Sequence, residues 1–190
     1  FIFYLLFFLL SQHKYCFSGD FKELLNELKT KNFNKKIEAI KKIGKSGNDE
    51  SEKILKALGS RKTTLMIDTN HAYGRTEAFQ LGIALKDYNL RWYEEPVVPE
   101  DIKGYSELKS KLTMPIAGGE NEHTLYGFRN LFENNCLDIA QPDIGSCGGI
   151  TACKHISTLA QSFGVEVNPH VWGSAVAQSA SLQIIASLPV

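Results

Sequence analysis

The sequence predicts an α/β protein, an incomplete (β/α)8 TIM-type barrel of about seven βα units. Short apolar runs alternate with stretches of helical periodicity, which is typical of a parallel sheet. Five consecutive apolar runs are each closed by an ionisable residue, at intervals of 23 to 27 residues: Asp68, Glu94, Glu120, Asp143 and His170. An ionisable residue at the carboxyl end of every strand is the pattern expected of an active site on a barrel. The regular spacing favours a closed barrel over an open doubly wound sheet.

Before residue 60 the patterns predict two strands, each followed by a helix. The strands are expected at 15–18 and 37–43, and the helices at 20–31 and 49–58. Asp20 is a suitable N-cap for the first helix, and Gly59 ends the second. The strand at 37–43 is the least regular element, because the same residues also fit a helix.

From residue 63 onward five strands and five helices are expected in strict alternation. The strands are predicted at 63–67, 90–93, 115–117, 137–140 and 165–167, and the helices at 76–88, 100–111, 124–133, 150–163 and 174–187. Thr124 and Ser174 are suitable N-caps, and Gly164 is a suitable C-cap. An eighth strand would be due where the sequence ends, and a full barrel takes about 250 residues. We therefore interpret the chain as a fragment.

The charge balance gives no support to a nucleic-acid or membrane-surface protein. The 190 residues include 21 Lys plus Arg and 21 Asp plus Glu, so the formal net charge is zero. The four cysteines form no CxxC pair, which indicates reduced thiols in a cytoplasmic protein. The first ten residues are apolar, but a membrane span needs about 20. We interpret residues 1–14 as an apolar remnant ahead of a partial barrel domain at 15–190.

The first three strand-end residues are carboxylates, which would repel one another at adjacent strand ends. A divalent cation bound by Asp68, Glu94 and Glu120 would remove this penalty, and all-oxygen ligation suits Mg²⁺. Glu94 and Glu95 point to opposite sides of their strand, so Glu94 is expected to face the metal and Glu95 to pair with a neighbour. The alternative is that each acid is an isolated surface residue or helix cap.

Asp143 and His170 close the next two apolar runs. A carboxylate beside an imidazole fixes the tautomer of the ring and makes the histidine a tuned general base. The alternative is a buried histidine with satisfied hydrogen bonds. On the opposite flank, the pair Lys41-Lys42 is either a second acid or base or a solvated basic pair. Three further histidines are expected in loops or on the surface without partners: His71, His123 and His155.

Six short motifs occur in order between residues 67 and 170. They are residues 67–73 (IDTNHAY), 92–96 (WYEEP), 118–120 (GGE), 141–143 (QPD), 148–151 (GGIT) and 168–170 (NPH). Together they resemble the mandelate racemase/muconate lactonizing enzyme family of the enolase superfamily. The resemblance covers roughly residues 15–190 and is densest after residue 65.

The resemblance implies a metal centre and a substrate contact. Asp68, Glu94 and Glu120 would bind Mg²⁺, which would hold the carboxylate of a small-molecule substrate and stabilise the enediolate formed when the α-proton leaves. Asn70 would contact the substrate near the metal.

The resemblance also implies groups that move the α-proton on both faces of the substrate. The His170–Asp143 dyad would act on one face. Members of the family carry a Lys-x-Lys pair on the second strand for the other face, and Lys42 fits its second lysine. Ile40 stands where the first would be, and a register shifted by one residue would select Lys41.

The implied reaction is α-proton abstraction from a hydroxy acid or sugar acid, leading to dehydration. Racemisation, epimerisation and cycloisomerisation share the first step and remain alternatives, as does a barrel fragment that binds metal without turnover. Family members carry an N-terminal capping domain, which we expect this chain to lack. A zinc hydrolase is disfavoured because no two of the five histidines are spaced as His-x-His. The resemblance leaves homo-oligomerisation open.

Overall fold

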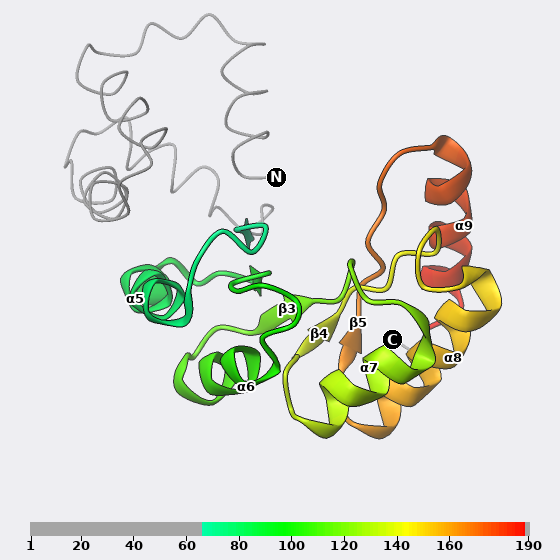
Figure 1. Ribbon diagram of the computed structural model, residues 1–190. Coiled ribbons are helices and arrows are strands. Elements are labelled where there is room, and N and C mark those ends of the chain that lie inside the picture. The colour runs from blue at the N-terminus through cyan, green and yellow to red at the C-terminus, as the bar shows by residue number, and fades with distance from the viewer. Residues whose placement is uncertain (1–65, 189–190) are drawn as a thin grey trace, which may run out of the picture.

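The computed structural model describes residues 66–188, which form a parallel sheet with helices packed against it (Figure 1). The elements predicted before this range, the domain boundary predicted at residue 14, and both Lys41 and Lys42 lie outside the described residues.

The sheet is parallel throughout, as the alternation of strands and helices predicted. Its strands are β1 (Ile67–Asp68), β2 (Tyr93–Glu94), β3 (Ile116–Gly118), β4 (Ile139–Ala140) and β5 (Glu166–Val167). They lie side by side in chain order, so every crossover adds its strand at the same edge. A doubly wound sheet would reverse its strand order, whereas a barrel adds strands in one direction. The barrel-type α/β fold is therefore confirmed.

A helical segment follows each strand of the described region. These are α5 (Arg75–Leu85) with the short 3-10 helix η1 (Lys86–Tyr88), α6 (Ile102–Lys111), α7 (Thr124–Glu133), α8 (Gly149–Ser162) and α9 (Ala175–Ala186). Every helix predicted after residue 75 is present, with its ends within three residues of the predicted ones. Within residues 66–188 no helix is both long and apolar enough to cross a membrane.

The described strands are two or three residues long. The strands β2, β4 and β5 are shorter than predicted and β3 has the predicted length, while the predicted start of β1 lies outside the described residues. The predicted strands stop just before Asp68 and Glu94, but both acids belong to the hydrogen-bonded ladder and lie opposite each other in its register. The apolar residues that precede them, such as Leu90, pack against the core without pairing. The apolar segments therefore do not coincide with the residues that pair in the sheet. A hydrophobic pattern in the sequence indicates burial and does not locate the paired residues.

The three predicted helix caps agree with the structure to different degrees. Ser174 is the N-cap of α9, and its hydroxyl accepts a hydrogen bond from the Ala177 amide at 3.2 Å. Thr124 is not an N-cap: it is the first residue of α7, with a left-handed φ of 64°, and the extended backbone that a cap needs belongs to His123. Gly164 follows the C-cap of α8, and its φ of 69° suits glycine in that position.

The hydrophobic core lies between the outer face of the sheet and the helices. Tyr93 is fully buried in β2, and its hydroxyl donates to the Ala78 carbonyl of α5 at 3.4 Å. Since side chains alternate along a strand, the neighbouring Glu94 points to the other face of the sheet. The sheet therefore presents apolar residues to the helices and Glu94 to its inner face.

An ion pair across the sheet shows that the sheet curls. Arg91 lies just before β2 and pairs with Glu166 of β5, although β3 and β4 lie between these strands. In a flat sheet, three strand spacings would separate the two backbones by about 14 Å. The contact brings the ends of this arc toward each other, as expected for part of a barrel wall.

We predict that Phe128 is a principal stabilising residue of α7, because its ring is fully buried in the core. Phe128→Ala should lower the free energy of unfolding by about 3–5 kcal/mol, measured by urea denaturation. Tyr126→Ala in the same helix is the matched control, since Tyr126 is 74% exposed and its loss should cost under about 0.5 kcal/mol. Equal losses in both variants would contradict this packing.

Candidate active site

Parallel strands bring the predicted site residues to one edge of the sheet. Asp68 ends β1 and Glu94 ends β2, and the ladder pairs them directly. Glu120 follows β3 after a turn at Gly119, whose φ is 113°. A Cβ on Gly119 would lie 2.7 Å from the Phe128 ring, so the turn that carries Glu120 out of the strand requires glycine.

Glu94 is the most enclosed of the three carboxylates predicted to bind metal, with 9% of its surface exposed. The Trp92 indole donates to its Oε2 atom at 2.8 Å. Burial raises the pKa of Glu94, hydrogen bonds from Gln141 and Trp92 lower it, and the charges of Asp68 and Glu120 raise it again. The three carboxylates therefore lie within electrostatic reach of one another.

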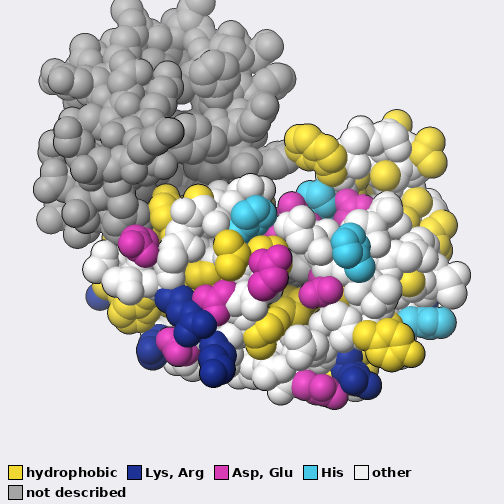
Figure 2. All heavy atoms as spheres, in the orientation of Figure 1, with side chains coloured by type: hydrophobic (Ala, Val, Ile, Leu, Met, Phe, Trp, Pro, Cys, Tyr) yellow, Lys and Arg dark blue, Asp and Glu magenta, His cyan; other side chains and the backbone are white. Residues whose placement is uncertain are grey.

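The predicted dyad is assembled in the structure. His170 directs Nδ1 to Oδ2 of the buried Asp143 at 2.7 Å, and its Nε2 lies 3.0 Å from Oε2 of Glu120. The Glu120 contact was not predicted. It joins the dyad to the carboxylate cluster, so the residues predicted to transfer protons and those predicted to bind metal are in contact. Figure 2 shows histidine and acidic side chains near one another on this face of the molecule.

The carboxylates do not form a preassembled cage. Among residues 66–188, no three His, Cys, Asp or Glu side chains converge closely enough to hold a metal ion. Glu120 is turned toward His170, and Asp68 accepts a hydrogen bond from the Asn70 amide at 2.8 Å. The donor types nevertheless fit Mg²⁺, because three carboxylates lie on adjacent strand ends and their negative charges repel one another.

A buried acceptor beside the carboxylates also suits a hydrated cation. Gln141 is 4% exposed, and its side chain is hydrogen-bonded to Glu94. Its Oε1 atom has no hydrogen-bond partner in the described part of the chain. A buried amide oxygen needs a donor, and metal-bound water or a substrate hydroxyl would supply one. Sequence reasoning missed this residue, although it begins the motif that contains Asp143.

Asn70, the predicted substrate contact, lies exposed two residues after Asp68, with a left-handed φ of 44°. Its backbone amide binds the Asp68 carboxylate, so the Asn70 side chain begins beside the candidate metal site. The predicted acid or base Lys42 lies outside the described residues.

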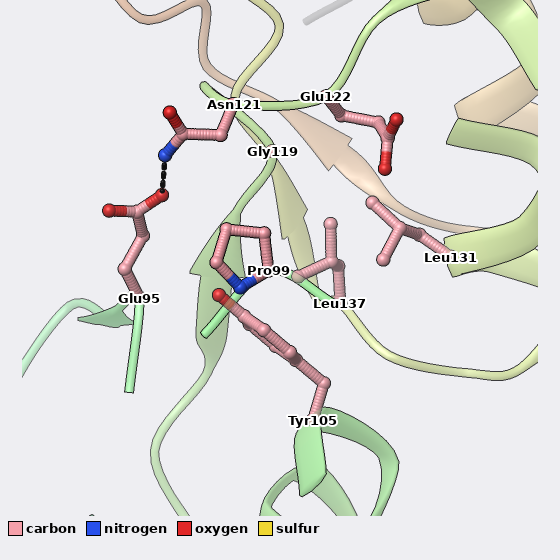
Figure 3. Close-up of a pocket in the computed structure, with 8 residues that line it drawn as sticks. All are labelled: Glu95, Pro99, Tyr105, Gly119, Asn121, Glu122, Leu131 and Leu137. Atoms are coloured by element: carbon pink, nitrogen blue, oxygen red, sulfur yellow. Dashed lines mark hydrogen bonds between the residues drawn. The ribbon is translucent and has the colours of Figure 1, made fainter. Parts of the chain in front are cut away.

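Glu95 pairs with neighbours, as predicted. Its carboxylate contacts Nδ1 of His71 at 3.0 Å and accepts a hydrogen bond from Nδ2 of Asn121 at 2.8 Å, the latter drawn in Figure 3. Burial raises the pKa of Glu95, as does the charge of Glu120, while the Asn121 hydrogen bond and His71 lower it. The expectation that His71 has no partner is wrong. His71 follows β1 and Glu95 follows the neighbouring strand β2, and this adjacency could have indicated the contact.

Known proteins are similar to this chain in sequence and in architecture. The family described as Enolase C-terminal domain-like matches residues 28–190. D-galactarolactone cycloisomerase of Agrobacterium fabrum is 43% identical over 124 residues, 65% of this chain and 33% of that protein. L-rhamnonate dehydratase of Saccharopolyspora erythraea is 46% identical over 114 residues, 59% of this chain and 29% of that protein. The chain thus spans about a third of the length of these curated relatives.

Solved structures agree with the sequence matches. The 3,6-anhydro-D-galactonate cycloisomerase from Zobellia galactanivorans is 41% identical with a TM-score of 0.72, covering 83% of this chain and 42% of that one. A putative dehydratase from Salmonella is 32% identical with a TM-score of 0.65, covering 67% of this chain and 32% of that one.

We predict that Glu94 destabilises the metal-free protein at neutral pH. Its folded-state pKa is raised, chiefly by burial, so its ionisation costs more in the folded than in the unfolded state. Glu94→Gln should therefore raise the free energy of unfolding without Mg²⁺ by about 0.5–2 kcal/mol at pH 7. The gain should disappear below the ordinary carboxyl pKa, where both states are protonated.

Urea denaturation at pH 7 and at acidic pH measures this difference. Glu133→Gln, at an exposed position at the end of α7, is the matched control and should change stability little. A Glu94→Gln protein less stable than the parent at pH 7 would contradict the conclusion that Glu94 destabilises the metal-free protein.

Proposed function

Because the chain belongs to the Enolase C-terminal domain-like family, we propose that this protein removes the proton α to the carboxylate of a sugar acid in a Mg²⁺-dependent reaction. The observation that carries the proposal is the contact of His170 with Asp143 on one side and Glu120 on the other. A general base is thereby held directly beside a cluster of metal-type ligands. The named relatives act on sugar-derived acids, which supports this substrate class.

In this proposal Asp68, Glu94 and Glu120 hold Mg²⁺. The ion would neutralise the substrate carboxylate and the negative charge that grows on its oxygens as the α-proton leaves. Glu94 is held by the Trp92 indole, which fixes one ligand in advance. Asn70 begins beside the same site and would orient the substrate, and Lys42 would act on its opposite face.

His170 is the proposed base, and Nε2 is the nitrogen that takes the proton. Nδ1 faces Asp143 at 2.7 Å, so the aspartate accepts the Nδ1 proton. In the proposed complex Glu120 would bind Mg²⁺ instead of contacting Nε2, which leaves the Nε2 lone pair of the neutral ring to take the proton. The substrate C–H bond breaks, the Nε2–H bond forms, and the electron pair moves onto the substrate carboxylate. Asp143 then stabilises the imidazolium.

The fate of the carbanionic intermediate separates two candidate activities. Expulsion of a β-hydroxyl gives dehydration, which we place first, and L-rhamnonate dehydratase supports it. Cycloisomerisation is the second candidate, favoured because a curated relative at 43% identity and a solved structure at 41% identity are both cycloisomerases. Reprotonation, as in racemisation, starts from the same intermediate.

We predict that Mg²⁺ stabilises the chain through Asp68. At 100 times its dissociation constant, bound Mg²⁺ should raise the free energy of unfolding by about 2.7 kcal/mol, several degrees in melting temperature. Asp68→Asn should abolish this shift, and Asp87→Asn at an exposed site in η1 should keep it, as measured by thermal unfolding. A parent that ignores Mg²⁺, or an unchanged shift in Asp68→Asn, argues against the metal centre.

We predict that exchange of the substrate α-proton depends on His170. With sugar acids and their lactones in heavy water, His170→Gln should slow exchange by about 10²- to 10⁴-fold, measured by proton NMR. His155→Gln on the exposed side of α8 is the control. Product mass separates the candidates, since dehydration removes one water and cycloisomerisation leaves the mass unchanged. Exchange at the parental rate in His170→Gln would contradict the assignment of His170 as the base.

A further inference from the structure

Glu95 is a buried acid that the proposed reaction does not use. It is 1% exposed, and both of its carboxylate oxygens are engaged, one by His71 and the other by Asn121. Glu95 directly follows β2 with a left-handed φ of 44°, and its carboxylate is occupied by His71 and Asn121 rather than by the candidate metal site. Burying a carboxylate is unfavourable unless it is paired, so two specific donors at a buried acid indicate a structural or functional role.

The partners of Glu95 come from the two loops that flank its own strand. His71 lies in the loop after β1, and Asn121 lies in the loop after β3. Each member of this trio directly follows a residue of the candidate active site. His71 follows Asn70, Glu95 follows Glu94, and Asn121 follows Glu120. A shift of any member by a fraction of an ångström therefore moves its neighbour in the site.

Backbone contacts tie the first two loops together in the same place. The His71 amide donates to the Glu95 carbonyl at 2.8 Å, and the Thr69 hydroxyl donates to the same carbonyl at 2.9 Å. The positions of these loops are thus fixed through the backbone as well as through the carboxylate of Glu95.

The backbone around the trio is strained. Asn70, His71 and Glu95 have left-handed φ values of 44°, 46° and 44°, although none is glycine. Such conformations cost on the order of 1 kcal/mol each and persist only where surrounding contacts enforce them. Hydrogen bonds of Glu95 hold His71 and Glu95 itself, and the Asp68 carboxylate holds the Asn70 amide. The strained residues lie beside the candidate metal ligands.

We propose that Glu95 is a positioning residue, which ties the loops after β1 and β3 to β2 and so sets the spacing of the Mg²⁺ ligands. This role rests on the metal centre proposed above. In Figure 3 the Glu95 carboxylate and the Asn121 amide point toward each other, while the Glu122 carboxylate lies apart from them. Loss of a residue that holds metal ligands in place typically weakens metal binding by about 10- to 100-fold.

The test is the dissociation constant of Mg²⁺ for the full chain, measured by titration calorimetry with magnesium chloride. Glu95→Gln, Asn121→Ala and His71→Ala should each weaken binding by about 10-fold or more. His71→Gln keeps an N–H donor and should recover most of the loss. The matched control is Glu122→Gln, which should bind as the parent does, because among residues 66–188 this carboxylate is hydrogen-bonded to the His123 amide of its own loop.

The metal-free melting temperature separates positioning from mere stability. Asn121 is exposed and His71 half-buried, so their variants should unfold near the parent temperature while the dissociation constant rises. If the parent binds Mg²⁺ and all the trio variants bind within about twofold of it, the positioning role is overturned and the metal centre stands. If the variants lose only metal-free stability, the role is likewise overturned. A parent without Mg²⁺ binding overturns the metal centre and the positioning role together.

Discussion

Parallel strand register is the constraint on which the rest of the molecule depends. Because all strands run in one direction, their carboxyl ends share one edge, and the ladder sets Asp68 opposite Glu94. The same arrangement concentrates negative charge at a half-enclosed position, where burial and neighbouring carboxylates oppose ionisation of Glu94. On the outer face of the sheet, Tyr93 and its apolar neighbours pack against the helices, so their burial is favourable.

Two hydrogen-bonded networks compensate for this charge on either side of the cluster. On one side His170 lies between Asp143 and Glu120, and on the other Glu95 lies among its two donors. Both networks join side chains from different strand ends, and both use an imidazole. Asp68 and Glu94 lie between the two networks, and this arrangement is compatible with the proposed cation site beside the proposed base.

Local sequence was sufficient for the elements and insufficient for their limits. Periodicity located each helix after residue 75, and Ser174 caps α9 as its residue type predicts. Thr124 has an equally suitable residue type but adopts a left-handed backbone inside α7. Whether a capping side chain is used depends on the backbone conformation at that residue, and in α7 the extended conformation belongs to His123.

The sequence by itself determined which ionisable residues reach the carboxyl edge of the sheet, because a strand followed by a helix repeats at a nearly constant interval. It also separated Glu94 from Glu95 through the alternation of side chains. Only the tertiary structure decided that Glu120 turns to His170 and that His71 reaches Glu95. These contacts join residues that lie 50 and 24 positions apart in the chain, respectively. Left-handed backbone positions and sheet curvature set them, and neither property leaves a periodic signal in the sequence.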